Sequence, residues 1–171
     1  NYHWYSAQLT DQTMEQTQQI IEQAGSNINT YINELYRLTL TPYYNDELLH
    51  TLEQTATSPQ QQLEFKRVVE GFLASVMSLP RSEILRVYIM NNTALYSYTR
   101  TPYEMAEYNN YLESDWYNQA CATTDPILLP PRLERVYGDD LTPIFSVVRQ
   151  VRSKEDNDIT LGVVKVGANY T

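Results

Sequence analysis

Polar and hydrophobic positions divide the chain into a helical first part and a strand-rich second part. From residue 7, alternating steps of three and four trace one stripe, polar at first and apolar from Ile21 onward. This spacing predicts a long helix over residues 1–40. Such a helix would be about 50 Å long, too long for a small domain to cover, so we expect a stalk that can also pair with a second copy. A plain core helix with a frayed start is the alternative.

Two shorter helices are expected over residues 41–81. Asn45 or Asp46 can cap the first of them, and leucines follow on one face. Ser58 and Pro59 form a typical start for the second, in which apolar residues recur at helical spacing. We therefore expect a helical segment between the stalk and the strands.

From residue 82 the hydrophobic period changes to two, which is typical of strands. The expected strands are residues 84–90, 94–100, 132–138, 143–153 and 159–167. The first two read as a hairpin around an Asn-Asn turn, and the polar segment 103–123 predicts short helical pieces. Helices followed by an antiparallel sheet define the α+β class, with the sheet over residues 82–171.

Composition and charge restrict the possible partners and chemistry. The 171 residues carry a net charge of −9, which argues against nucleic acid or an anionic membrane surface as the direct partner. A single cysteine, Cys121, cannot form an internal disulfide. With only two histidines, far apart in the sequence, a metal site made of cysteine and histidine ligands is excluded. Motifs for phosphate loops and nucleophiles are absent from the sequence. We therefore expect a non-enzymatic domain without metal or cofactor.

The expected strands carry an unusual set of tyrosine and arginine residues. Fifteen residues are tyrosine, a side chain suited to half-wet surfaces and polar pockets. Alternation places Arg86 beside Tyr88 on one strand face, Tyr96 beside Tyr98 on another, and Arg149 within an apolar row. Gathered on one side of a curved sheet, these residues would form a pocket for a small ligand. A solvated face with cross-strand Tyr–Arg stacking is the alternative.

A tryptophan–tyrosine pair, Trp116 and Tyr117, lies in the polar segment between the strands. Adjacent helical residues point in different directions, so the pair can either fill a small core or close over a ligand. The sequence around the pair leaves both interpretations open.

Three short motifs occur in an order that resembles a known family. They are Asp115-Trp116-Tyr117-Asn118-Gln119-Ala120, Phe145-Ser146-Val147-Val148-Arg149 and Leu161-Gly162-Val163-Val164-Lys165-Val166. Together with the long N-terminal helix, they resemble the extracytoplasmic Cache-type (PAS-like) sensor domain of bacterial membrane-bound histidine kinases. The resemblance covers nearly the whole chain.

This resemblance implies a five-stranded antiparallel sheet packed on the long helix, with a ligand pocket over the opposite face. The segment that carries the Trp-Tyr pair would cover that pocket. The resemblance also implies a homodimer on the outer side of the cell membrane, anchored through flanking segments. The candidate ligand-binding residues are Trp116, Tyr117, Tyr88, Tyr96, Tyr98, Arg149 and Asp125.

The ligand class is narrowed by one departure from the family pattern. Cache receptors for amino acids often place an arginine shortly before the Trp-Tyr pair, where it can grip a carboxylate. Residues 112–115 contain no arginine, which disfavours an amino acid, and the association of similar kinases with sugar uptake implies a carbohydrate. The alternative function is a protein-interaction or envelope-stress module without a small ligand.

Overall fold

The structure of the chain, a computed structural model, describes residues 19, 22, 25, 28–78, 83–100, 110–137 and 140–169. Its helices are α3 (Ile28–Leu38), α4 (Asp46–Leu52), α5 (Pro59–Met77) and α6 (Asp115–Ala122), with the 3-10 helices η2 (Thr41–Tyr44) and η4 (Tyr111–Glu113). Its strands are β1 (Ile84–Met90), β2 (Leu95–Thr99), β3 (Ile127–Tyr137), β4 (Asp140–Arg152) and β5 (Thr160–Ala168).

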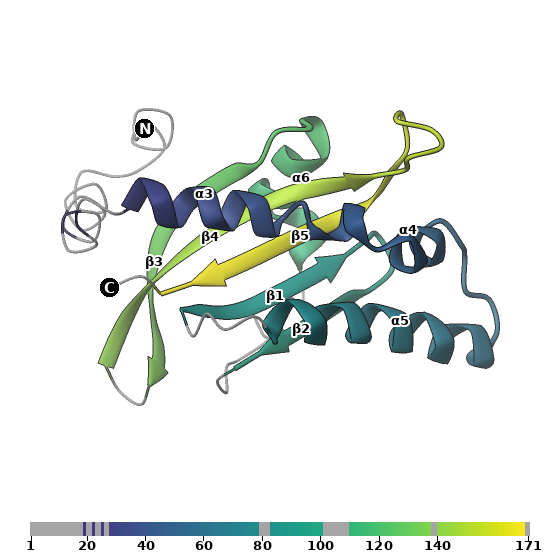
Figure 1. Cartoon of the computed structure of the whole chain (residues 1–171), viewed down its shortest axis with the longest axis horizontal. Helices are drawn as coiled ribbons and strands as arrows, with labels where there is room; N and C mark the ends of the chain where they lie inside the picture. The colour runs from purple at the N-terminus through teal and green to yellow at the C-terminus, as the bar shows by residue number, and fades with distance from the viewer. Residues whose placement is uncertain are drawn as a thin grey trace.

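The strands form one five-stranded antiparallel sheet in the order β2-β1-β5-β4-β3. Helices α3, α4 and α5 lie on one face of this sheet, and α6 lies on the other (Figure 1). The last strand of the chain, β5, is therefore the central one. This arrangement confirms the predicted α+β class and the five antiparallel strands.

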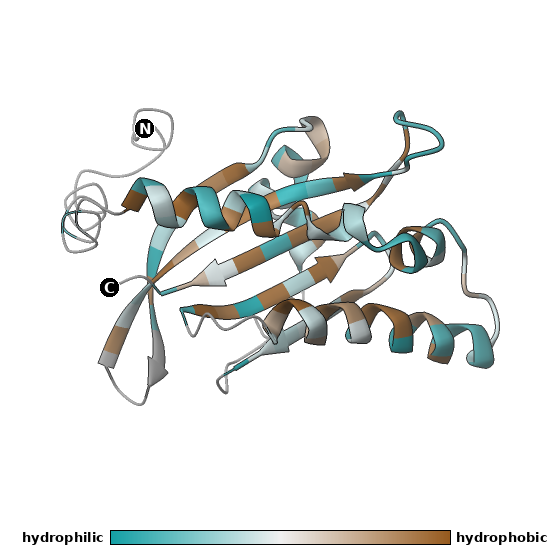
Figure 2. Ribbon diagram, viewed as in Figure 1, coloured by the Kyte–Doolittle hydropathy of each residue, from teal (hydrophilic) through white to brown (hydrophobic). Residues whose placement is uncertain are grey.

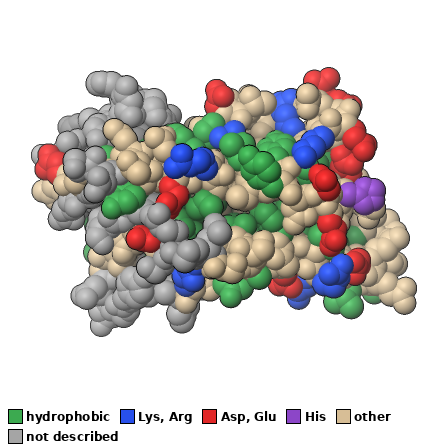
Figure 3. All heavy atoms as spheres, in the orientation of Figure 1, with side chains coloured by type: hydrophobic (Ala, Val, Ile, Leu, Met, Phe, Trp, Pro, Cys, Tyr) green, Lys and Arg blue, Asp and Glu red, His purple; other side chains and the backbone are tan. Residues whose placement is uncertain are grey.

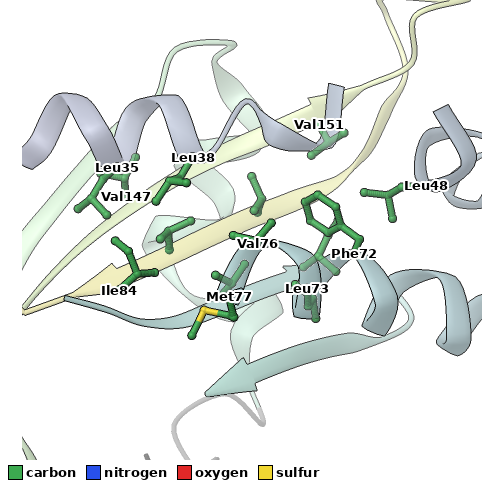
Figure 4. Close-up of a cluster of buried hydrophobic side chains, with 14 of the residues drawn as sticks. Leu35, Leu38, Leu48, Phe72, Leu73, Val76, Met77, Ile84, Val147 and Val151 are labelled. Carbon is green, nitrogen blue, oxygen red and sulfur yellow. The ribbon is translucent and has the colours of Figure 1, made fainter. Parts of the chain in front are cut away.

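The larger hydrophobic core lies between the sheet and the helices α3, α4 and α5. Leu35 of α3 and Phe72 and Leu73 of α5 pack with Val147 and Val151 of β4 (Figure 4). Hydrophobic residues of α5 lie on the side that faces the sheet (Figure 2). Full burial of one such side chain contributes about 1.5–3 kcal/mol, so this face supplies most of the stability.

Both shorter helices begin at the residues that the sequence indicates. The side chain of Asn45 accepts a hydrogen bond from the Leu48 amide at 3.0 Å and caps α4. Ser58 and Gln61 form a reciprocal capping box at the start of α5, with Pro59 in its first turn. Local capping chemistry therefore determines where these helices start.

Exposed charges on the helical face are mixed in sign (Figure 3). The guanidinium of Arg67 on α5 lies 2.5 Å from Glu64 and 3.6 Å from Glu47 of α4. All three side chains are more than half exposed, and such surface pairs contribute little stability.

A second, smaller core lies on the α6 side of the sheet. Tyr88 of β1, Val148 of β4 and Val163 of β5 meet Ala120 of α6 there. Every residue of β1 is buried, and from Val87 to Met90 alternate side chains belong to the larger and the smaller core. The middle of the sheet is thus covered on both faces.

One expectation from the sequence differs from what the structure describes, and another is left largely untested. The strand expected at 132–138 begins earlier, at Ile127, and runs through Pro130 and Pro131. Prolines are tolerated there because β3 is an edge strand. Of the helix expected over 1–40, α3 is the continuous described part; most of the remainder lies outside the described residues, so the stalk stays a prediction.

Gly162 allows β5 to approach β1 closely, and its replacement should destabilise the fold. A Cβ atom at this position would lie 2.6 Å from the backbone oxygen of Met90. Because a backbone oxygen cannot swing aside, Gly162→Ala should cost about 1–3 kcal/mol and lower the melting temperature by roughly 3–10 °C. Thermal denaturation followed by circular dichroism measures this effect.

Gly71 provides the matched control. It lies within α5, and a Cβ atom there would have no neighbour within 4 Å. Gly71→Ala should stabilise the protein by about 0.5–1 kcal/mol, because alanine has the higher helix propensity. Equal melting temperatures for the two variants would show that the approach of β5 to β1 is not the constraint we describe.

Candidate ligand-binding site

A cavity of about 230 Å³ lies between α6 and the face of the sheet beneath it. Four strands and α6 contribute to its wall, so residues far apart in the sequence meet there. Its charged and aromatic side chains include Arg86, Tyr88, Trp116, Arg132, Glu134 and Lys165. The volume is just below the ~300–1,000 Å³ typical of drug-sized sites, so the space suits a metabolite-sized molecule.

One hydrogen bond caps the start of α6, and another joins its end to the sheet. At its start, the hydroxyl of Ser114 accepts from the Tyr117 amide at 3.3 Å. At its end, the amide group of Gln150 on β4 donates to the backbone oxygen of Thr123 at 2.5 Å. The Gln150 carbonyl in turn accepts from the Thr160 hydroxyl at 2.7 Å. Gln150 is buried, and its polar atoms are satisfied on both sides.

The two aromatic residues of the Trp-Tyr pair point to different surroundings. Trp116 lines the cavity. Tyr117 packs edge to face against Tyr111, with ring centroids 5.6 Å apart. Burial raises the pKa of Tyr117 to about 12, and the nearby Cys121 and Tyr111 add to the rise. One ring of the pair therefore borders the cavity and the other packs in a small core; closure over a ligand stays a prediction.

Lys165 of β5 places a cation against the aromatic wall of the cavity. Its Nζ lies 4.6 Å from the centroid of the Trp116 ring and 5.9 Å from that of Tyr88. Both distances are within the range of cation–π attraction. With only 7% of its surface exposed, the ammonium is held in the cavity and not in bulk solvent.

A buried ion pair forms another part of the wall. Arg86 of β1 is bonded through Nη1 to the carboxylate of Glu134 on β3. Their side chains are 3% and 18% exposed. Because unpaired buried charges are costly, each of these residues supports the placement of the other.

The shape of β3 brings Glu134 and Arg132 to the cavity. The pairing of β3 with β4 shifts register between Leu129 and Arg132, where Pro130 and Pro131 lie. A bulge of this kind bends a strand and increases its twist. Beyond the bulge, Arg132 and Glu134 both line the cavity.

The structure brings together only some of the predicted site residues. Trp116 and Tyr88 line the cavity, and Tyr117 lies next to it. The expectation that Tyr96 and Tyr98 share the face of Tyr88 is wrong. They pair with Ile89 and Val87, and directly opposed residues lie on one face, so both tyrosines are on the α5 side, where Tyr96 packs against Phe65.

Arg149 and Asp125 also lie outside the cavity. Arg149 is on the α3 side of β4, where its Nε donates to the Thr39 hydroxyl at 3.0 Å. Burial lowers the pKa of Arg149, an effect opposed by Tyr43, Asp125 and Tyr36. Asp125 is exposed in the loop between α6 and β3. The prediction that Arg149 forms the pocket floor with Tyr88 is therefore wrong, because the two residues face opposite sides.

The charged residues of the cavity were not among the predicted site residues. For Arg86 a signal existed, because strand alternation already placed it on the face of Tyr88. Lys165 occupies the same face, directly opposite Tyr88 on the neighbouring strand. For Glu134 and Arg132 the sequence offers no local signal, because the β3 bulge decides where they point.

A wider hollow lies at the end of the sheet where β1 and β2 are joined, with a volume of about 770 Å³. It is bordered by the α4–α5 loop, the β1–β2 turn and the beginning of β5. Its polar side chains are mostly uncharged and include Gln54, Gln62, Asn92 and Thr93. Its chemistry thus differs from that of the charged cavity under α6.

Among the described residues, no cluster of histidine, cysteine and acidic side chains is placed to bind a metal ion. Within the same part of the chain, no helix combines the length and apolarity needed to cross a membrane.

No protein-family model matches this chain, and no curated protein sequence matches it. Solved structures do match. The ligand-binding domain of the Campylobacter jejuni chemoreceptor Tlp3 with L-valine has a TM-score of 0.57 at 16% identity, over 92% of this chain and 60% of that one. The same domain with 4-methylisoleucine has a TM-score of 0.54 at 14% identity, over 93% of this chain and 59% of that one.

These matches show the class of fold. The chain has the Cache-type fold of bacterial ligand-binding sensor domains, as the resemblance in the sequence implied. It spans about three fifths of the length of these chemoreceptor domains. At these identities the comparison establishes architecture, and the ligand has to be argued from the cavity itself.

Replacement of Gln150 should loosen α6. Gln150→Leu keeps the volume but leaves the Thr123 carbonyl and the Thr160 hydroxyl without this partner, at a cost of about 1–3 kcal/mol. We expect a melting temperature lower by roughly 3–10 °C and faster amide hydrogen exchange in α6. Exchange measured by mass spectrometry resolves the helix as a peptide.

Gln60→Leu, on the exposed side of α5, is the control and should change stability by less than about 0.5 kcal/mol. Unchanged exchange of α6 in Gln150→Leu would mean that apolar contacts alone hold the helix.

Proposed function

We propose that this chain is the extracytoplasmic sensor domain of a membrane-bound receptor. It binds a small molecule that carries a carboxylate, such as an amino acid, in the cavity beneath Trp116. The observation that carries the proposal is the charge of that cavity. Arg86, Arg132 and Lys165 line it, and the first and last of these are nearly fully buried.

The cavity offers matched groups for a molecule with both charges. Guanidinium and ammonium groups form strong, charge-assisted hydrogen bonds with carboxylates. Asp115, at the start of α6, supplies negative charge on the same wall, where a ligand ammonium can bind. The expectation against amino acids rested on the missing arginine in residues 112–115; cations from β1, β3 and β5 can take its place.

The solved structures of similar fold support a small-molecule ligand. The Campylobacter jejuni Tlp3 domain is described in complex with L-valine and with 4-methylisoleucine. A cavity under the segment of the Trp-Tyr pair also favours ligand sensing over the alternative of a protein-interaction or envelope-stress module, for which a filled core would be expected there.

We further propose that ligand occupancy is transmitted along the chain to flanking membrane segments of a homodimer. The signalling module is a histidine kinase in the sequence resemblance, whereas the structural neighbours are chemoreceptors. Both classes need a helix pair whose two packing arrangements differ by only a few kcal/mol. The sequence beyond residue 171 in the gene distinguishes them directly.

A carbohydrate, the class that the sequence implied, is the second candidate. The wider hollow at the β1–β2 end favours it, because amide and hydroxyl side chains and the rings of Tyr96 and Tyr117 border that space. Neutral polar groups next to aromatic rings suit sugars. In this case Tyr96 would contact the ligand from the opposite side of the domain to Trp116.

Thermal-shift screening tests the proposal. Amino acids, dicarboxylates and sugars are added singly to the protein. A carboxylate ligand at a hundred times its Kd should stabilise the fold by about 2.7 kcal/mol, which corresponds to a rise of roughly 5–10 °C. Trp116→Ala should lose most of that rise, because the variant lacks the ring over Lys165.

Tyr98→Ala is the matched control, since Tyr98 is exposed on the other face of the sheet. It should keep the full ligand-induced rise. A sugar that stabilises the protein equally with and without Trp116 would favour the wider hollow as the site, and no response to any carboxylate would contradict the proposed ligand class.

A further inference from the structure

The Arg86–Glu134 ion pair crosses the width of the cavity floor. In the sheet, β5 and β4 separate β1, which carries Arg86, from β3, which carries Glu134. Strands are spaced about 4.8 Å apart, so the two Cα atoms belong to strands three spacings apart. The pair can form because the intervening positions are small and the hairpin bends.

The small positions form one cross-strand row. Arg86 is directly opposite Gly167 on β5, and Gly167 is directly opposite Ser146 on β4. Both small residues line the cavity. Their lack of bulk leaves a trough along which the arginine and glutamate side chains approach each other. The carboxylate of Glu134 consequently lies within the space that a bound molecule would use.

We infer that Glu134 is an internal competitor for the ligand: its carboxylate occupies the position on Arg86 that the carboxylate of the ligand takes. This inference rests on the proposed function. It explains how a buried guanidinium can face the cavity. Arg86 needs an anion there, and Glu134 supplies one until a ligand arrives.

Two properties follow from this exchange. First, the ligand replaces one guanidinium–carboxylate contact by another, so the contact with Arg86 adds little to affinity and the rest of the molecule determines selectivity. Second, binding releases the Glu134 side chain from Arg86, while the backbone at Glu134 stays paired with Thr142 of β4. The apparent Kd equals the intrinsic Kd divided by the fraction of molecules in which Glu134 does not occupy Arg86.

Acetate is a suitable probe, because it is a carboxylate without further groups. The experiment measures the melting temperature of the wild-type chain and of Glu134→Gln at pH 7.5, in sodium acetate and in sodium chloride of equal ionic strength. Glutamine keeps the shape of glutamate and removes its charge. In chloride, Glu134→Gln should melt below wild type. In acetate, its melting temperature should rise by roughly 3 °C or more, with no such rise in wild type.

Two controls make the result specific. The double variant Arg86→Met/Glu134→Gln should not show the rise of Glu134→Gln, because the guanidinium that Glu134 occupies is gone while Arg132 and Lys165 remain. Glu70→Gln removes an exposed carboxylate of α5 and should behave as wild type, which excludes an effect of net charge alone.

The inference is overturned if folded Glu134→Gln responds to acetate no more than wild type, or if the double variant responds equally. Should Glu134→Gln fail to fold, Glu134→Asp provides the same test. Its shorter carboxylate contacts Arg86 less well, so acetate should stabilise it more than wild type, and an equal response would refute the inference. Failure of the ligand screen with a positive acetate result would reject the proposed ligand and leave the competition between Glu134 and anions established.

Discussion

The attachment of α6 to the sheet depends on the side-chain amide of Gln150. It is fully enclosed, and it joins the end of α6 to β4 while its oxygen accepts from Thr160 of β5. The adjacent residue, Arg149, points through the opposite face and bonds Thr39 at the end of α3. Two consecutive residues of β4 therefore connect both covering layers. Because buried polar groups must keep their partners, a displacement of α6 is felt by the same strand segment that holds α3.

Much of the fold could be predicted from local sequence. Strand alternation located β1 at its observed residues, and Asn45, Ser58 and Pro59 located the helix starts. Alternation shows which residues of one strand share a face, but it does not show which residues of the next strand lie on that same face. The β1–β2 turn sets that phase: the amide of Asn91 donates to the Ala94 oxygen, and this pairing puts Tyr96 opposite Ile89.

The candidate site was harder to predict because its charges come from separate strands. The two partners of the Arg86–Glu134 pair are 48 residues apart, and a bulge in β3 aligns them. No periodicity within a single strand encodes such an encounter. The prediction that Arg149 belongs to the pocket was wrong for a related reason. An arginine in an apolar row suggests a pocket, whereas here its guanidinium donates a hydrogen bond to a buried threonine of the helical layer. The different surroundings of the Trp-Tyr pair could be predicted, because adjacent residues of a helix point in different directions.

The alternation along β5 has a consequence for how such domains diversify. The side chains of Val164 and Val166 point into the large helical core. The side chain of Lys165 points into the cavity, which Gly167 also lines. Packing of the helical layer and lining of the cavity are thus assigned to opposite faces of one strand, and mostly to different residues. If the cavity binds the proposed ligand, mutations on its face alter which molecule is recognised while the helical core continues to hold the fold. Substitutions at Lys165 or Gly167 should therefore disturb the packing of the helical layer less than substitutions at Val164 or Val166.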